Sequence, residues 1–319
     1  MTRTALLLLL AAPAPIADAP APGHYRATGQ PAVAAGLAGP SAELPLATDG
    51  YERLTVPVRL GAAGPYRFLV DTGSDRTAVS RELAGKLGLA GRDQLVMHSA
   101  TGASQVRIAF LPEIFTGKRS VRDIRAPMLD AANIGADGIL GIDSLHSQRV
   151  VFDFLAQRLS IHSGRAAQGQ DDNVIVVRAR RLQGRLVITD AEVNGERVAV
   201  VLDTGSSLTV GNAALRRKLE RRGGINPVGP IDLVSVTGAS LRGELGRVDR
   251  LDIAGARLEG LSIAFAEAHT FRQLGLGRKP ALLLGMNALR GFDRVTIDFA
   301  GRSVSLMLPP DGKRRLPAG

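Results

Sequence analysis

Cysteine and tryptophan are both absent from the 319 residues, and only 4% of the chain is aromatic. Without cysteine there can be no disulfide, no catalytic thiolate and no cysteine-ligated zinc or iron–sulfur centre. The core must therefore be built from valine, leucine, isoleucine and alanine, and clusters of the branched residues favour β-strands. Apolar residues make up 45% of the chain and charged residues 22%, which is typical of a globular protein.

Acidic residues are fewer than basic ones, 30 against 40, so the formal net charge is +10. Nucleic-acid-binding proteins often carry such an excess. Here, however, the basic residues are spread along the chain and cluster only at 178–181, 215–222 and 312–315. The scarcity of aromatic side chains also removes the stacking platforms that bind single strands. We therefore expect solvated basic faces and no nucleic-acid partner.

Residues 1–19 have the pattern of a secretory signal peptide. Arg3 precedes an apolar run of roughly ten residues, too short to span a bilayer, and Ala17–Ala19 offers a cleavage site. This pattern predicts a periplasmic or secreted protein that is not inserted in a membrane once the signal is removed. Residues 20–48 are rich in alanine, proline and glycine, and we expect them to form an extended linker.

The rest of the chain is an internal duplication, because five landmarks recur in the same order. In each copy a strand, a turn and a second strand lead to Asp-Thr-Gly-Ser, and a short amphipathic helix follows. An S-x-T-G-A-S stretch, an apolar pair before glycine and a closing strand complete the copy. The landmarks after the strand pair are Asp71–Ser74, 80–89, Ser99–Ser104, 138–145 and 150–154 in the first copy, and Asp203–Ser206, 211–223, Ser235–Ser240, 282–289 and 295–299 in the second.

Two lobes follow from this duplication. We expect an N-terminal lobe over residues 49–163 and a C-terminal lobe over residues 174–308. Residues 164–173 between them are small and polar and predict a linker. Residues 309–319 predict a basic tail without regular structure.

Each Asp-Thr-Gly-Ser motif puts an aspartate directly after an apolar strand, where a buried charge is costly. The equivalent aspartates of a duplicated lobe, Asp71 and Asp203, would face each other across a pseudo-twofold axis. Two facing carboxylates cannot readily both ionise, so the pair holds one proton. One carboxylate then acts as general base on a water while the protonated one polarises a carbonyl. The proton belongs to the pair, and the sequence assigns it to neither member.

The threonines and glycines of the motifs have expected supporting roles. Gly73 and Gly205 permit a tight turn that brings backbone N–H groups to the carboxylates. The hydroxyls of Thr72 and Thr204 can donate hydrogen bonds across the axis and join the two loops.

The motif serines have an expected effect on pKa. Ser74 and Ser206 can donate to the outer carboxylate oxygens, which favours the ionised form. This interaction would lower the pKa values of the pair. It predicts an activity optimum at about pH 4–6.

At these motifs the chain resembles the aspartic proteases, and most closely their retropepsin-like bacterial branch in a single-chain, duplicated form. The two Asp-Thr-Gly-Ser motifs carry the resemblance together with "ILGID" at 139–143 and "LLGMN" at 283–287. It covers about residues 50–308, and it implies an all-β acid-protease fold of two pseudo-twofold-related β-barrel lobes with short helices.

The resemblance also implies roles for residues outside the motifs. Apolar-apolar-Gly stretches would pass behind the motif loops, and short helices opened by aspartate or asparagine would follow. The residues so implied are Gly141, Asp143, Gly285 and Asn287.

Two substrate-covering flaps are implied at 100–104 and 236–240, although an ordinary hairpin turn is the alternative at both. The flap residues expected to contact substrate are Thr101, Gly102, Thr237 and Gly238. Asp75 follows the first motif where retroviral enzymes use an aspartate to hold the substrate backbone. An ion pair with an arginine is the alternative role for Asp75.

The implied function is an aspartic endopeptidase that hydrolyses peptide or unfolded protein between its lobes, needs no cofactor and acts as a monomer with an internal pseudo-dimer. A non-catalytic peptide-binding module with the same fold is one alternative. A metal-dependent hydrolase is another, since paired carboxylates also bind cations. We expect no metal, because the histidines lack H-x-x-x-H spacing and suit surface or packing positions. The histidines are His24, His98, His146, His162 and His269.

Overall fold

Strands form most of the molecule, and the helices between them are short. The computed structural model describes residues 5–7, 9–11, 42–50, 52–89, 91, 93–117, 119–145, 148–163, 174–308 and 313–316. The expected linker at 164–173 lies outside these residues, as do His24 and His146.

The first half of the chain contains fifteen strands and three helices among the described residues. The strands are β1 (Ala5–Leu7), β2 (Leu9–Ala11), β3 (Ala42–Pro45), β4 (Ala47–Thr48), β5 (Leu54–Leu60), β6 (Ala63–Val70), β7 (Ala78–Ser80), β8 (Gln94–Ser99), β9 (Gly102–Phe110), β10 (Ile114–Thr116), β11 (Arg119–Val121), β12 (Arg125–Leu129), β13 (Gly138–Leu140), β14 (Gln148–Asp153) and β15 (Arg158–Ser163). The helices are α1 (Arg81–Lys86), α2 (Ala131–Ile134) and α3 (Ile142–Leu145).

The second half repeats this order of elements. Its strands are β16 (Val174–Arg178), β17 (Arg180–Leu182), β18 (Arg185–Ile188), β19 (Ala191–Val193), β20 (Glu196–Arg197), β21 (Ala199–Leu202), β22 (Thr209–Gly211), β23 (Asn226–Ser235), β24 (Ser240–Ile253), β25 (Ala256–Phe265), β26 (Ala281–Leu284), β27 (Arg294–Asp298), β28 (Ser303–Met307) and β29 (Lys313–Arg315). Its helices are α4 (Ala213–Glu220), α5 (His269–Gln273) and α6 (Met286–Leu289).

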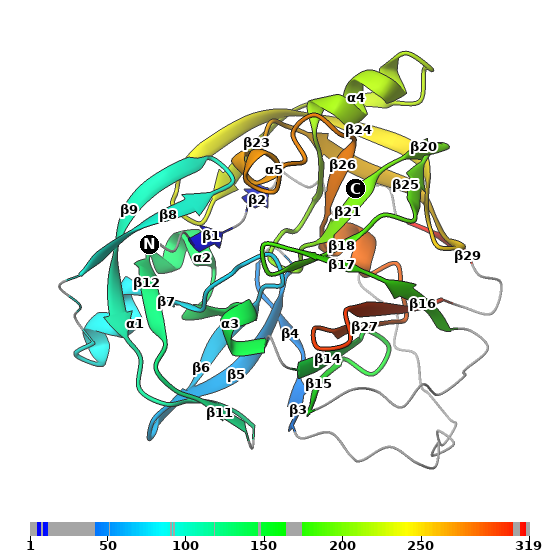
Figure 1. The fold of residues 1–319 in the computed structure, drawn as a ribbon. Helices are drawn as coiled ribbons and strands as arrows, with labels where there is room; N and C mark the ends of the chain where they lie inside the picture. Colours follow the sequence, from blue (N-terminus) through cyan, green and yellow to red (C-terminus); the bar gives the residue numbers. More distant parts are fainter. Residues whose placement is uncertain are drawn as a thin grey trace, which may run out of the picture.

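Each lobe is built on its own large sheet, as Figure 1 shows. The N-terminal sheet has the order β8-β9-β12-β7-β13-β6-β5-β10-β11, and the C-terminal sheet has the order β17-β18-β21-β26-β22-β25-β24-β19-β20, with β23 beside β24. The same parallel pairs occur in both, β13 with β6 and β26 with β21. The fold is therefore the expected all-β, two-lobed one.

The closing strands of the two copies form a third sheet together. Its order is β16-β28-β27-β14-β15-β3, and β14 pairs antiparallel with β27, with Val150 opposite Ile297. Figure 1 shows this sheet beneath the C-terminal lobe and beside β5 and β6 of the N-terminal lobe. The lobes are thus joined by main-chain hydrogen bonds as well as by the covalent connection.

The helices that follow the motifs form where the pattern predicts them. Ser80 caps α1 by accepting a hydrogen bond from the Leu83 N–H (3.0 Å). Asn212 caps α4 in the same way, accepting from Leu215 (3.0 Å). Side chains of this kind satisfy N–H groups that have no partner within the helix.

Two terminal expectations are corrected by the structure. The expected linker at 20–48 includes strands at its end, because β3 pairs with β15 and β4 pairs with β5. The expected tail at 309–319 includes β29, which pairs parallel with β25, and Leu316 after it is buried. In both cases a sheet offered an unpaired edge, and edge hydrogen bonds do not depend on side-chain pattern.

None of the described helices has the length and apolarity needed to cross a membrane.

Candidate active site

The motif loops begin where a buried strand of each lobe ends. Phe68 to Val70 are buried at the end of β6, and Val200 to Leu202 are buried at the end of β21. The strand alongside fixes each loop, because the N–H of Asp71 donates to Leu140 and that of Asp203 donates to Leu284, both at 3.0 Å. Both aspartates are thereby held at the ends of their strands.

The apolar-apolar-Gly stretches pass behind the loops, as expected. A Cβ atom on Gly141 would lie 2.3 Å from the carbonyl carbon of Arg76, and one on Gly285 would lie 2.3 Å from the carbonyl oxygen of Leu208. Distances this short mean that only glycine fits at either position.

Asp143 and Asn287 occupy equivalent places in the two lobes. The Oδ1 atom of Asp143 accepts from the N–H and hydroxyl of Thr77 (2.8 and 2.7 Å). The Oδ1 atom of Asn287 accepts from the same two groups of Thr209 (both 2.8 Å). Each side chain therefore ties the short helix behind its loop to the strand that leaves the motif.

The two loops are joined through their threonines across the pseudo-twofold axis. The Thr72 hydroxyl donates to the carbonyl of Leu202 (3.1 Å), and the Thr204 hydroxyl donates to that of Val70 (2.6 Å). Each hydroxyl also accepts from the N–H of the other threonine, at 3.2 and 3.0 Å. The expected bonds across the axis are thus present, in reciprocal pairs.

The two aspartates meet at this junction and are almost completely buried, Asp71 being 2% exposed and Asp203 0%. The Asp71 carboxylate accepts from the Gly73 N–H (2.8 Å) and lies against Gly205 of the other lobe. A Cβ on Gly205 would stand 2.4 Å from the Asp71 Cγ. Gly205 therefore leaves room for the opposite carboxylate, in addition to turning the chain.

Burial raises the pKa of both aspartates. Desolvation raises the pKa of Asp71 to about 6, although the Gly73 N–H and two arginines act in the opposite direction. Desolvation and the neighbouring charge of Asp71 raise the pKa of Asp203 well above its ordinary value. Two coupled carboxylates of this kind share a proton over a wide pH range.

A family model described as aspartyl protease matches residues 56–144 and 189–288, which together make up more than half of the chain. The chain belongs to the aspartyl protease family. Each matched region contains one motif of the duplication. A search of curated proteins found no match.

The motif serines of this aspartyl protease do not act as expected. The Ser74 hydroxyl donates to the carbonyl of Arg76 and the Ser206 hydroxyl to that of Leu208, both at 2.7 Å. The hydroxyls therefore do not donate to the carboxylates. Desolvation raises the pKa values of the two aspartates, and it outweighs the backbone N–H groups of the two serines, which do lower these values. Each serine closes its own loop, because a carbonyl two residues ahead lies within reach of the hydroxyl.

Two buried arginines, which the sequence analysis did not single out, hold the motif loops from the opposite lobe. Arg185 donates from Nε to the carbonyl of Gly73 (2.9 Å), and Arg53 donates to the carbonyl of Gly205 (3.4 Å). Each stands 18 residues before the aspartate of its own lobe, and each is 1% exposed. This equal spacing in the two copies was the signal that could have revealed them.

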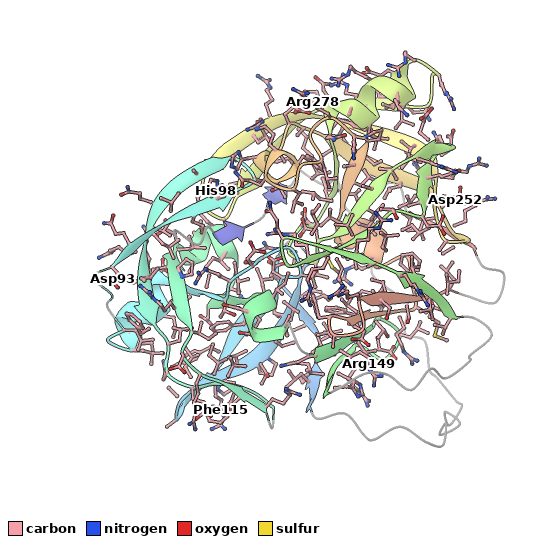
Figure 2. All side chains as sticks on the ribbon, in the orientation of Figure 1. Asp93, His98, Phe115, Arg149, Asp252 and Arg278 are labelled. Atoms are coloured by element: carbon pink, nitrogen blue, oxygen red, sulfur yellow. The ribbon has the colours of Figure 1, made fainter. Side chains whose placement is uncertain are left out.

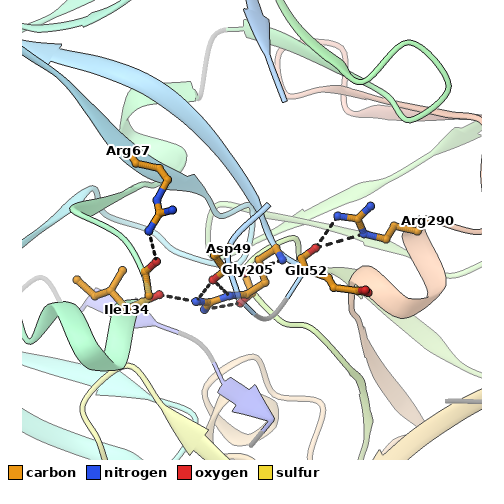
Figure 3. Close-up of polar contacts among 8 residues, drawn as sticks. Asp49, Glu52, Arg67, Ile134, Gly205 and Arg290 are labelled. Atoms are coloured by element: carbon orange, nitrogen blue, oxygen red, sulfur yellow. Dashed lines mark hydrogen bonds and ion pairs between the residues drawn. The ribbon is translucent and has the colours of Figure 1, made fainter. Parts of the chain in front are cut away.

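Each of these arginines also has a carboxylate partner. Arg53 forms an ion pair with Asp49, its Nε lying 2.8 Å from Oδ2, and further bonds join it to Ile134 and Gly205 (Figure 3). Arg185 forms an ion pair with Asp75 at 3.2 Å. Asp75 therefore forms an ion pair with an arginine in this structure, which was the alternative to a role in holding the substrate backbone.

The two expected flaps form hairpins whose tips meet. β8 and β9 turn at Ala100 and Thr101, and β23 and β24 turn at Val236 to Ala239. The Thr101 hydroxyl donates to the Ser235 hydroxyl of the other hairpin (3.1 Å). Gly102 and Gly238 have φ angles of 138° and 83°, in the region that favours glycine. Thr237 lies at the second tip, where its hydroxyl is 2.6 Å from that of Ser235.

The described part of the chain contains no group of three or more histidine, aspartate or glutamate side chains that could hold a metal ion. His98 and His269 lie together, with ring nitrogens 2.7 Å apart, and their other side-chain hydrogen bonds among the described residues are with Gln273 and Arg272. A pair of this composition does not offer the usual ligands of a catalytic zinc ion.

Proposed function

We propose that the protein is an aspartic endopeptidase in which Asp71 and Asp203 together activate a water molecule. The observation that carries this proposal is the pair of buried, electrostatically coupled carboxylates from opposite lobes, both with raised pKa values. Between its two pKa values such a pair holds one proton, and it offers a base and an acid to the same carbonyl group.

The reaction needs only the pair, water and the peptide. The ionised carboxylate accepts a proton from the water as its oxygen attacks the carbonyl carbon, and the protonated carboxyl gives its proton to the carbonyl oxygen. The tetrahedral intermediate returns that proton and breaks the C–N bond, while the amine leaves with the proton taken from the water. Each carboxyl group is then in the protonation state that it had before the reaction.

The substrate is an extended peptide held between the lobes. The β8–β9 and β23–β24 hairpins stand on the two sides, and the peptide would pair as an added strand at the edges of β8 and β23 that β1 and β2 occupy in this structure. The pattern of residues 1–19 supports export to the periplasm or the exterior, where unfolded protein would be the substrate. One chain supplies both aspartates, which supports action as a monomer.

Hydrolysis of casein by wild type, Asp71→Asn and Asp203→Asn tests the proposal. We expect either substitution to reduce the rate by roughly a thousandfold or more, because the pair loses its base or its shared proton. Asp93→Asn is the matched control, since Asp93 is half-exposed and pairs with Arg125 on the surface. Equal hydrolysis by all four proteins would place the chemistry elsewhere. Binding of casein without hydrolysis by wild type would favour the peptide-binding module.

A further inference from the structure

Each motif loop exposes only two of its residues, and they stand at equivalent positions in the two copies. In residues 71–80 and 203–212, every residue is buried except the fourth and fifth after the aspartate. These are Asp75 and Arg76 in the N-terminal loop and Ser207 and Leu208 in the C-terminal loop. They form the surface that each loop presents beside its aspartate.

The two exposed pairs differ in charge. Asp75 and Arg76 are both ionisable, whereas Ser207 and Leu208 are neutral. Asp75 already has a partner inside the protein, because Arg185 lies 3.2 Å from it and is 1% exposed. The charge of Asp75 is therefore balanced, and Arg76 gives the N-terminal loop a cation that the C-terminal loop lacks.

The Arg76 guanidinium has no partner of its own. Within the described part of the chain, its side chain forms no hydrogen bond and no ion pair. Desolvation raises the pKa of Asp75 and of Asp143, and the charge of Arg76 acts on both in the opposite direction, but only at longer range. Asp143 is bonded to Thr77 behind the loop. A partly buried guanidinium has five N–H donors to satisfy, and a carboxylate can accept from two of them at once, so this loop offers a site for an acidic side chain.

The C-terminal loop offers an apolar contact in the equivalent place. Leu208 is partly exposed, and Ser207 beside it carries no charge. Arg53, the equivalent of Arg185, pairs with Asp49 and is 1% exposed, so it brings no charge to the surface of this loop. An aliphatic side chain placed against Leu208 leaves water, which is favourable, whereas an acidic one would lose its hydration there without gaining a partner.

We propose that Arg76 and Leu208 give the peptidase a directional specificity, in which Arg76 binds an acidic side chain on one side of the scissile bond and Leu208 contacts an aliphatic side chain on the other. This inference rests on the proposed function, because it places the scissile bond at Asp71 and Asp203. The loops are related by the pseudo-twofold axis on which the reciprocal threonine bonds lie, so the two substrate positions are equally far from the scissile bond. Identical loops would bind a peptide in either direction, and the difference between them selects one.

Binding of two block peptides tests this direction without using activity. One peptide has a block of glutamates before a block of leucines, and the other has the reverse order, so their composition and charge are the same. The full-length Asp203→Asn protein is used, because it should hydrolyse neither peptide. At neutral pH we expect calorimetry to show one order bound about tenfold more tightly than the other, since only that order places a glutamate at Arg76. Equal affinities, or no binding of either peptide, would overturn the proposal.

Further substitutions in this protein show whether the two residues cause the preference. Arg76→Gln should remove it, and Arg76→Lys should keep its direction, because the charge remains. Leu208→Arg should also remove the preference for order, and it should strengthen binding of a peptide of glutamates alone by about tenfold, which a misfolded protein could not do. Arg197→Gln is the matched control, since the Arg197 side chain is 91% exposed on β20. Equal effects of Arg76→Gln and Arg197→Gln would overturn the role of Arg76.

Cleavage sites in casein test the same residues in the active protein. Mass spectrometry of the fragments from wild type should show glutamate or aspartate enriched at one position, and aliphatic residues enriched at the position equally far on the other side of the cleaved bond. Arg76→Glu should replace the acidic preference by one for lysine or arginine and leave the aliphatic preference unchanged, because only the charge at the N-terminal loop is reversed. Arg197→Glu should change neither preference. The same cleavage sites for wild type and Arg76→Glu would overturn the proposal.

Failure of the inference can be distinguished from failure of the proposed function. If no protein cleaves casein but binding to Asp203→Asn depends on peptide order and on Arg76, the proposed function fails and the directional preference stands. If wild type cleaves casein, Asp203→Asn does not, and Arg76→Glu leaves the cleavage sites unchanged, the proposed function stands and the inference is wrong.

Discussion

At the scale of single residues, the burial of Asp71 and Asp203 sets the pH dependence. Burial raises the pKa of Asp71 to about 6 and that of Asp203 well above its ordinary value. The form with one proton exists between the two values, so activity should rise as the pH increases through about 6. We expect the profile of kcat/KM to reach its maximum above pH 6, beyond the range of 4–6 that donation by the motif serines would give. An optimum at or below pH 5 would contradict this expectation.

The same burial makes the aspartates destabilising at neutral pH. Their pKa values are higher in the folded chain than in the unfolded one, so the folded state binds more protons and stability falls as the pH rises from about 4. For Asp71, a shift from 3.8 to about 6 corresponds to about 3 kcal/mol of stability lost at neutral pH.

Asp71→Asn and Asp203→Asn should therefore melt at a higher temperature than wild type at pH 7, since neither amide ionises. The advantage should shrink towards pH 3, where the aspartates are protonated in both states. Calorimetry at the two pH values measures it, with Asp93→Asn as the surface control. A lower melting temperature at pH 7 would show that the carboxylates stabilise the fold.

At the scale of elements, strand β18 stabilises the motif loop of the opposite lobe through its first residue, Arg185. Arg185→Met should lower the free energy of unfolding by about 3–5 kcal/mol, because it removes both the bonds to the Gly73 carbonyl and the partner of Asp75. Arg185→Met/Asp75→Asn should recover part of this loss, since the carboxylate charge is then gone too. Urea unfolding of the three proteins measures the difference. Equal losses in the single and double variants would show that the Gly73 bonds carry the whole effect.

Repetition made much of this architecture predictable. The duplicated motifs gave the strand-loop-helix order, the threonine bonds and the places of Gly141 and Gly285, because each feature follows from a pattern that occurs twice. The pairing of β3, β4 and β29 could not be predicted, since main-chain bonds at a sheet edge leave no side-chain pattern. The hydrogen bonds of the motif serines were also not predicted. A hydroxyl can donate to any of several acceptors within reach, and the distances that decide between them cannot be read from a sequence.

At the scale of the whole molecule, each flap tip packs into the other lobe. Ala100 lies in an apolar cluster of the C-terminal lobe with Phe271 and Leu274, and Val236 lies in one of the N-terminal lobe with Ile134. The two hairpins thus connect the lobes through their tips, and the sheet of β14 and β27 connects them a second time. We expect at least one tip to leave its cluster when a peptide enters.

The β8–β9 hairpin has an additional contact, which should make its opening sensitive to pH. The Nδ1 atom of His98 lies 2.7 Å from the Nε2 atom of His269 in α5, and the Ala100 carbonyl accepts from the His269 N–H (2.7 Å). Figure 2 shows His98 where this hairpin meets the C-terminal lobe. One ring nitrogen must accept, so the contact requires at least one neutral ring. Burial, His98 and the charge of Arg272 all lower the pKa of His269.

Acidification should therefore loosen the β8–β9 hairpin and leave the β23–β24 hairpin unchanged. If both rings carry a proton on each nitrogen, neither can accept, so the bond is lost and the two cations repel. Hydrogen exchange, corrected for the intrinsic effect of pH, should show protection at Met97 to Gly102 falling between pH 7 and pH 5. His269→Gln should abolish this dependence, because glutamine does not titrate, and the tip at Val236 is an internal control within the same chain. If both tips lose protection equally, opening is a property of the interface between the lobes and not of the histidine pair.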